Sequence, residues 1–217
     1  MKNIAVILAA GVGNRFGGDL PKQFLKIENK EILAYSLETF SQCSDIDEIV
    51  LVVNDAYLDI YNRIIKEYKI GKISQLVTGG AERQNSVENA IKYISSKEEE
   101  CIVLVHDAAR PFVSEKIIKE NIEAVRKYKC CTTAVRSSDS VYLTNNGEFI
   151  KEVNRNNVYL AQTPQSGFLS LFKSAYEGVK TIFTDEAALF SELGYLPYIV
   201  IGEDKNKKIT FQEDIKK

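Results

Sequence analysis

Short apolar runs alternate with amphipathic segments over about the first 130 residues of the chain. Four runs rich in β-branched residues lead into Gly, Asn or Asp, which predicts strands at 4–11, 48–55, 73–80 and 101–111. The first, second and fourth runs are apolar at consecutive positions. We therefore expect these strands to be covered on both faces of a sheet.

Helical periodicity is found in segments beside these runs. The segments 31–43, 85–100 and 114–128 repeat apolar residues three and four positions apart, and Ser114 is expected to cap the third helix. Strands that alternate with helices predict right-handed crossovers, and hence an α/β fold with a mostly parallel sheet and helices on both faces. Ligands bind beyond the carboxyl ends of such strands, so we expect the loops at 8–24, 78–86 and 106–111 to be neighbours.

The pattern changes from about residue 132. Asn146 and Gly147 stand between two strand-like runs, which predicts a β-hairpin. Because a hairpin has little core of its own, we expect an arm at about 134–158 that extends from a single domain, 1–217, and packs on a second copy of the chain.

The remaining segments predict further elements of the same domain. Residues 158–178 and 184–195 are interpreted as strand-to-helix units, with Thr184 capping the second helix, and residues 197–203 and 207–211 as late strands.

Composition excludes several functional classes. Lys and Arg number 28 against 30 Asp and Glu, whereas a protein that coats nucleic acid is usually basic. The four cysteines show no C-x-x-C spacing and the chain has one histidine, which argues against structural zinc and favours reduced thiols. No apolar run approaches the ~18 residues of a membrane span, so we expect a soluble, cytoplasmic protein.

The opening loop, "LAAGVGNRFGGDLPKQF" (8–24), is the first candidate for binding chemistry. Gly11 and Gly13 allow backbone amides to approach a ligand, and Arg15 and Lys22 add positive charge, which suggests a phosphate group. The alternative interpretation is a common Gly-rich turn between a strand and a helix, with both charges merely solvated.

Two familiar phosphate loops do not fit these residues. A dinucleotide fingerprint needs a third glycine where Phe16 stands, and a Walker A loop needs Gly-Lys-Ser/Thr where Asp19 follows Gly18. The observed G-x-G-x-R-(x)5-P-K-Q pattern instead resembles the signature of nucleotidyltransferases that join a sugar phosphate to a nucleoside triphosphate. The leaving pyrophosphate gathers negative charge, which two fixed cations would stabilise.

The loop after the fourth strand, "HDAARP" (106–111), supplies further polar groups. Alone, Asp107 would be interpreted as a turn or cap carboxylate, and Arg110 as its surface partner. Beside a triphosphate loop, the two side chains together could bind a metal ion and a second phosphate. His106 is interpreted as a structural hydrogen-bonding group rather than a general base.

Six motifs occur in order along the chain: "PKQF", "GGAERQNSV", "VHDAARPF", "AQTPQSGF", "TDEAALFSELG" and "NKKIT". With the opening loop, they resemble the 2-C-methyl-D-erythritol 4-phosphate cytidylyltransferases over nearly the whole chain. The resemblance implies a Rossmann-like fold, a homodimer formed through a β-arm, and transfer of CMP from CTP to that polyol phosphate for isoprenoid precursors. Ribitol-5-phosphate cytidylyltransferase is the nearest alternative. A catalytically silent nucleotide-binding protein is a third.

The resemblance also implies roles for individual residues. The triphosphate would be held by Gly11, Gly13, Arg15 and Lys22. The cytosine pocket would contain Ala9, Ala10, Gly80 and Ser86, with Arg83 nearby. The polyol phosphate would meet Asp107, Arg110, Ser140, Thr163, Thr184 and Lys208, together with Arg155 from the partner chain. Mg²⁺ or another divalent cation would be bound at Asp107.

Two positions depart from the family pattern. Ala81 stands where many members carry an acidic residue near the base, which puts part of the base recognition in question. Ser140 replaces a usual threonine but keeps the hydroxyl group.

Overall fold

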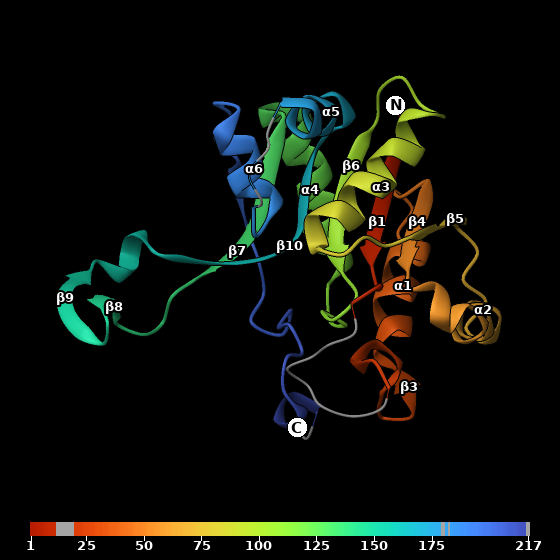
Figure 1. The fold of residues 1–217 in the computed structure, drawn as a ribbon, viewed down its shortest axis with the longest axis horizontal. Helices are drawn as coiled ribbons and strands as arrows, with labels where there is room; N and C mark the ends of the chain where they lie inside the picture. Colours follow the sequence, from red (N-terminus) through yellow and green to blue (C-terminus); the bar gives the residue numbers. More distant parts are fainter. Residues whose placement is uncertain (12–19, 179–180, 182, 216–217) are drawn as a thin grey trace.

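The computed structural model describes residues 1–11, 20–178, 181 and 183–215. Among these residues, a seven-stranded sheet forms the centre, in the order β11-β7-β10-β6-β1-β4-β5 (Figure 1). Strand β10 runs antiparallel to β6 and β7, and the other pairings in the sheet are parallel. The strands are β1 (Asn3–Leu8), β4 (Glu48–Val53), β5 (Ile73–Thr78), β6 (Ile102–Asp107), β7 (Cys130–Arg136), β10 (Tyr159–Phe168) and β11 (Tyr198–Ile201).

Helices cover both faces of the sheet, as predicted. Helices α1 (Ile32–Gln42), α2 (Leu58–Glu67) and α4 (Glu115–Tyr128) pack on one face. Helices α3 (Arg83–Ser95), α5 (Leu169–Gly178) and α6 (Glu186–Glu192) pack on the other.

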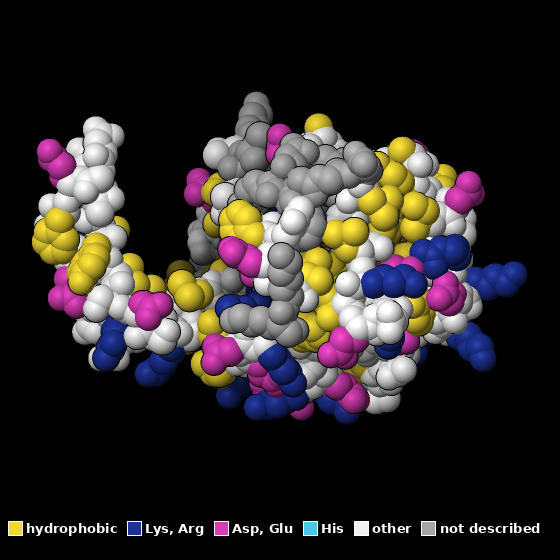
Figure 2. Space-filling view, turned by 90° about the horizontal axis from the view of Figure 1, so that it is seen from below, with side chains coloured by type: hydrophobic (Ala, Val, Ile, Leu, Met, Phe, Trp, Pro, Cys, Tyr) yellow, Lys and Arg dark blue, Asp and Glu magenta, His cyan; other side chains and the backbone are white. Residues whose placement is uncertain are grey.

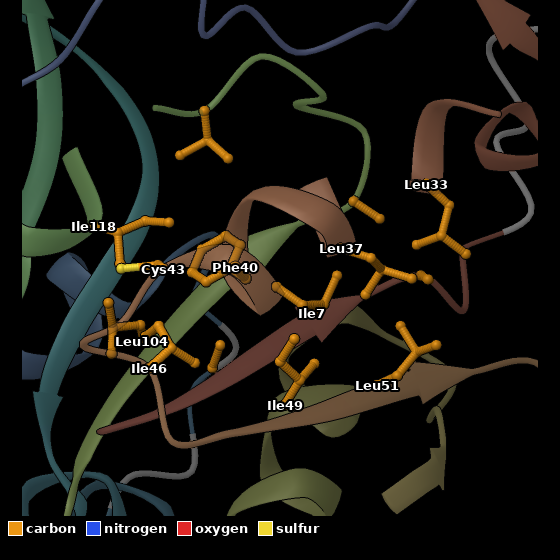
Figure 3. Close-up of a cluster of buried hydrophobic side chains, with 14 of the residues drawn as sticks. Ile7, Leu33, Leu37, Phe40, Cys43, Ile46, Ile49, Leu51, Leu104 and Ile118 are labelled. Atoms are coloured by element: carbon orange, nitrogen blue, oxygen red, sulfur yellow. The ribbon is translucent and has the colours of Figure 1, made fainter. Parts of the chain in front are cut away.

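Successive side chains of the central strands enter opposite cores. In β1, Ile7 belongs to the core under α1 and α4, and Val6 to the core under α3 and α5. Figure 3 shows the first core, where Ile7 lies among Leu37, Phe40 and Leu104. This burial on both sides explains the uninterrupted apolar runs within β1, β4 and β6.

Most of the predicted elements are present within a few residues of their expected bounds. The Ser114 hydroxyl accepts a hydrogen bond from the Ile117 amide at 3.4 Å and so caps α4, as expected. Helix α2 was not predicted, although its sequence buries Tyr61 and Ile64 at helical spacing.

The predicted hairpin forms an arm. Strands β8 (Val141–Asn145) and β9 (Glu148–Val153) make a separate two-stranded sheet that projects from the body of the molecule (Figure 1). Asn146 and Gly147 form the turn with φ of 48° and 87°, the positive values that a tight hairpin turn requires. The 3₁₀ helix η3 (Arg155–Asn157) leads back to β10.

Three sequence predictions at the C-terminal end are wrong. Residues 207–211 form no strand, because Ile209 packs against Ile27 and Ile32 instead of pairing with the sheet. Residues 183–185, directly before α6, do not form the expected strand. The cap of α6 is Asp185 rather than Thr184, because the Asp185 carboxylate accepts from the Ala188 amide at 3.0 Å.

Short elements complete the described chain. They are η1 (Lys22–Phe24), the small antiparallel pair β2 (Lys26–Ile27) and β3 (Lys30–Glu31), η2 (Asp55–Tyr57) and η4 (Gln212–Ile215). Within the described ranges, no helix is both long enough and apolar enough to cross a bilayer.

Candidate active site

The carboxyl ends of the parallel strands meet at one edge of the sheet. Backbone hydrogen bonds tie these ends together: Ala108 donates to Leu8, and Gly79 donates to Val53. A cavity of about 380 Å³ opens at this edge. Its described lining includes residues from the segments after β1, β5 and β6, so the described parts of the three predicted loops are neighbours, and Asn54 and Lys208 complete it.

Many of the sequence-predicted residues line this cavity. They are Ala9, Ala10, Gly11, Lys22, Gly80, Arg83, Ser86, Asp107 and Lys208. Gly13 and Arg15 lie outside the described residues.

The two ends of the opening loop are joined by a buried glutamine. Gln23 Nε2 donates to the carbonyl oxygens of Ala9 (2.6 Å) and Gly11 (3.0 Å), and the Tyr61 hydroxyl donates to the same Ala9 oxygen (2.7 Å). Gln23 follows Lys22 directly, and Lys22 Nζ donates to the carbonyl of Ile209 at 2.6 Å. The neighbour of Lys22 thus fixes the start of the loop, a role that the motif did not reveal.

Close packing requires glycine where the second loop enters α3. A Cβ on Gly79 would overlap the Cβ of Ala10, and a Cβ on Gly80 would overlap that of Asn85. The Gly80 amide donates to Ser86 Oγ at 3.0 Å. Ser86 therefore helps to shape the loop that packs against Ala10.

Four charged side chains form a row beside the cavity: Lys208, Asp107, Arg83 and Glu186. Lys208 Nζ lies 2.6 Å from Asp107 Oδ2, and Arg83 Nε lies 3.2 Å from Asp107 Oδ1. Arg83 Nη1 and Nη2 donate to the two oxygens of Glu186 at 2.6 and 2.9 Å. Glu186 was not predicted as a site residue.

The charges of this row support one another. Burial acts to raise the pKa of Asp107, but Arg83 and Lys208 outweigh it and hold that pKa well below its ordinary value. Burial acts to lower the pKa of Arg83, but Glu186 and Asp107 raise it overall. Burial raises the pKa of Glu186, and Arg83 opposes that shift. The row therefore alternates basic and acidic side chains, and Arg83 favours the ionised form of both carboxyl groups.

His106 and Arg110 hold backbone around the cavity. His106 is fully buried, with Nδ1 3.0 Å from Thr163 Oγ1 and Nε2 3.1 Å from the carbonyl oxygen of Arg110. Burial lowers the pKa of His106 to about 4, so the ring is neutral at pH 7. The Arg110 guanidinium donates to the carbonyls of Asn206 (2.8 Å) and Ala161 (3.2 Å). Neither residue belongs to the described lining of the cavity.

Comparison with known proteins decides the family. The family model for 2-C-methyl-D-erythritol 4-phosphate cytidylyltransferase matches residues 3–217. The chain belongs to this family. The Clostridium botulinum (strain Langeland) enzyme of that name is 39% identical over 218 residues, which cover 99% of this chain and 94% of the relative.

Solved structures of the family share the fold. The 4-diphosphocytidyl-2C-methyl-D-erythritol synthase of Anaerococcus prevotii aligns with a TM-score of 0.85 at 31% identity, covering 99% of this chain and 92% of that chain. The Francisella tularensis 2-C-methyl-D-erythritol 4-phosphate cytidylyltransferase aligns with a TM-score of 0.80 at 32% identity, covering 100% and 97%. The α/β sheet with its separate hairpin is therefore the fold of this family.

The other residues that the family resemblance implied are placed as follows. The Thr163 hydroxyl accepts from the Asp107 amide at 3.1 Å, behind the cavity. Thr184 is exposed just before α6. Ser140 and Arg155 are exposed on the arm, where Arg155 donates to the Ser138 carbonyl at 3.1 Å. None of the four lines the described cavity of the same chain.

Two carboxylate residues, Glu82 and Asp107, line the cavity where a divalent cation would bind. The described residues contain no cluster of three or more His, Cys, Asp or Glu side chains suited to a metal ion. Mg²⁺ is often held by one or two carboxylates together with substrate phosphates. Asp107, at the cavity wall, fits that mode of binding.

Proposed function

We propose that this protein transfers CMP from CTP to 2-C-methyl-D-erythritol 4-phosphate, giving 4-diphosphocytidyl-2-C-methyl-D-erythritol and pyrophosphate for isoprenoid precursors. The observation that carries the proposal is the cavity at the sheet edge, where Lys22, Lys208 and Asp107 converge in a chain that belongs to the cytidylyltransferase family. The relatives described above carry the methylerythritol name, which supports this acceptor over ribitol 5-phosphate.

The small residues of the cavity would bind the nucleotide. The cytosine ring would lie between two walls of the cavity, one formed by Ala9 and Ala10 and the other by Gly80 and Ser86. All four residues are small, which leaves room for a flat ring. The triphosphate would extend past Gly11 toward Lys22. In our proposal, Gly13 and Arg15 contribute from the part of the loop beyond Gly11.

The reaction needs no protein nucleophile. A phosphate oxygen of the acceptor attacks the α-phosphorus of CTP in line, and the bond from that phosphorus to pyrophosphate breaks. A phosphate monoester has a second pKa near ~6, so the acceptor is largely a dianion at neutral pH and requires no general base. The buried, neutral His106 is therefore not needed for proton transfer.

Catalysis then consists of positioning and charge neutralisation. Lys22 and Arg15 would stabilise the charge that develops on the leaving pyrophosphate. Lys208, with Arg155 of a second copy, would hold the acceptor phosphate. Mg²⁺ bound by Asp107 and the phosphates would neutralise part of their charge, which lets two polyanions approach each other.

A homodimer would complete the site. The arm exposes Tyr142, Leu143, Phe149 and Ile150 by 47–64%, and Figure 2 shows hydrophobic side chains along it. Such a surface favours burial against a second copy, and it would bring Arg155 toward that copy's cavity.

The four cysteines are buried free thiols, which supports a place in the reducing cytoplasm.

The experiment is a pyrophosphate-release assay with Mg²⁺, CTP and either acceptor. We expect release with 2-C-methyl-D-erythritol 4-phosphate and little with ribitol 5-phosphate. Comparable release with ribitol 5-phosphate would favour the alternative enzyme, and no release with either acceptor would favour a silent binder. ATP in place of CTP is the matched control for the nucleotide.

Lys22→Ala tests the charge-stabilising role. We expect kcat to fall by at least ~100-fold, because one fixed cation facing the leaving pyrophosphate is lost. Lys92→Ala is the control, since Lys92 is 69% exposed and pairs only with Glu88 on the surface of α3. A near-normal kcat in Lys22→Ala would contradict the mechanism.

A further inference from the structure

Glu186 is a buried carboxylate next to the site with no role in the proposed reaction. Its side chain is 3% exposed and does not line the described cavity. Both carboxylate oxygens accept hydrogen bonds from the terminal nitrogens of Arg83, which does line the cavity. A buried carboxylate that binds a residue of the site through both of its oxygens has a position from which to orient that residue.

We propose that Glu186 is a positioning residue: it fixes the Arg83 guanidinium so that one oxygen of Asp107 stays available to Lys208. This inference deepens the proposed function and rests on it. A guanidinium is planar, and a carboxylate that binds both terminal nitrogens sets the orientation of that plane. Nε is then the nitrogen that faces Asp107, and it takes only Oδ1, at 3.2 Å.

The second oxygen of Asp107 shows the consequence. Oδ2 lies 2.6 Å from Lys208 Nζ, the amine assigned to the acceptor phosphate. Without the Glu186 charge, the terminal nitrogens of Arg83 would be free to turn onto both oxygens of Asp107, since bidentate pairing is the strongest arrangement open to them. Lys208 would then lose its partner, and its amine would no longer be held beside the cavity.

The backbone around Glu186 is fixed from two sides. Gln165 on β10 accepts from the Ala187 amide at 2.9 Å and donates to Asp185 at 3.2 Å. Gln84 on α3 accepts from the Phe183 amide at 2.8 Å. Because the start of α6 is tied to both β10 and α3, the carboxylate meets Arg83 from a rigid support.

The test is a double-mutant cycle with Glu186→Gln, Arg83→Gln and both together, measured as kcat/KM for 2-C-methyl-D-erythritol 4-phosphate. Glu186→Gln keeps the side-chain shape, and we expect kcat/KM to fall about 10- to 100-fold, the scale of a misplaced site group. In the Arg83→Gln background, the same change should alter kcat/KM by less than about twofold, because Glu186 acts through Arg83. Glu192→Gln, an exposed change on the same helix, should have no effect.

Protein stability is separated from positioning by thermal melts and by NMR. Glu186→Gln leaves the half-buried Arg83 charge without this partner, so we expect its Tm to fall below that of the double variant, which removes both charges. The Nε–H resonance of Arg83, assigned by its absence in Arg83→Gln, should shift in Glu186→Gln and not in Glu192→Gln.

Three results would overturn the inference. One is a folded Glu186→Gln protein with kcat/KM within twofold of the wild type. Another is a double variant that loses tenfold more than Arg83→Gln alone. The third is an unchanged Arg83 resonance. Failure of the proposed function would look different, because the wild type itself would release no pyrophosphate while the resonance still reported the pairing of Arg83 and Glu186.

Discussion

Asp107 lies at the end of β6 with a different cation on each carboxylate oxygen. A carboxylate in this position would be costly if it were alone, because burial disfavours the charged form. Arg83 and Lys208 reverse that preference and depress its pKa. The residue that would bind metal is thus kept ionised by the groups that surround it.

This depressed pKa predicts how stability depends on pH. The ionised form of Asp107 stabilises the folded state above its unfolded pKa of about 4, and this contribution is lost as the pH falls toward the lower folded pKa. We expect urea unfolding at pH 6 to show the wild type as more stable than Asp107→Asn. The difference in free energy of unfolding between the two proteins should be smaller at pH 3.

The comparison between the two proteins cancels the titrations of groups that do not interact with Asp107; the His106 titration is not cancelled, because the Asp107 charge raises the pKa of that ring. Asp139→Asn, on the exposed part of the arm, is the matched control and should show no pH-dependent gap. A difference between wild type and Asp107→Asn that stays constant from pH 6 to pH 3 would contradict this account.

At the scale of elements, the backbone of the loop between β5 and α3 passes so close to Ala10 that there is no room for a side chain at Gly79. Gly79→Ala would push a Cβ into Ala10 and to 3.2 Å from Ser86 Oγ. Because both neighbours form walls of the proposed base pocket, we expect the KM for CTP to rise about tenfold or more, the scale of a misplaced binding group. Steady-state kinetics with varied CTP measures this.

Gly71→Ala is the control for that change. A Cβ at Gly71 meets nothing within 4 Å, so the substitution tests only the loss of a glycine. Equal effects of the two substitutions on the KM for CTP would show that the contact with Ala10 is unimportant.

The elements also show what sequence reasoning can reach. The strands β1, β4 and β6 were predictable because burial on both faces leaves an uninterrupted apolar run. The segment 207–211 has only two apolar residues, Ile209 and Phe211, and it packs beside the sheet. The pattern of apolar residues does not say whether an extended segment finds a pairing partner. Arg83 was predicted from a motif, whereas its partner Glu186 lies 103 positions away and becomes visible only once α3 and α6 are packed together.

At the scale of the whole molecule, the arm is the feature that predicts assembly. Phe149→Asp would place a charge on a side chain that is 64% exposed and that we expect to be buried between two copies. We expect light scattering coupled to size exclusion to show a shift from twice the chain mass to a single chain. Transferase activity should fall with it, since Arg155 would no longer reach the other copy.

An apolar residue on the body of the protein provides the control. Ile201→Asp changes a side chain of similar exposure, 57%, on the edge strand β11. If that variant also became monomeric, or if Phe149→Asp remained dimeric and active, the proposal that two copies assemble through the arm would be wrong.

The segment that carries Lys208 is held by hydrogen bonds to Thr163 and Arg110 and by a hydrogen bond to Lys22. Asn206 donates to the Thr163 carbonyl at 2.9 Å and accepts from Arg110, and the Ile209 carbonyl accepts from Lys22. A stop codon shortly before Asn206 would consequently do more than delete one acceptor-side lysine. It would also remove a hydrogen-bond acceptor of Lys22, the lysine assigned to the donor, so the truncation would affect both sides of the proposed reaction at once.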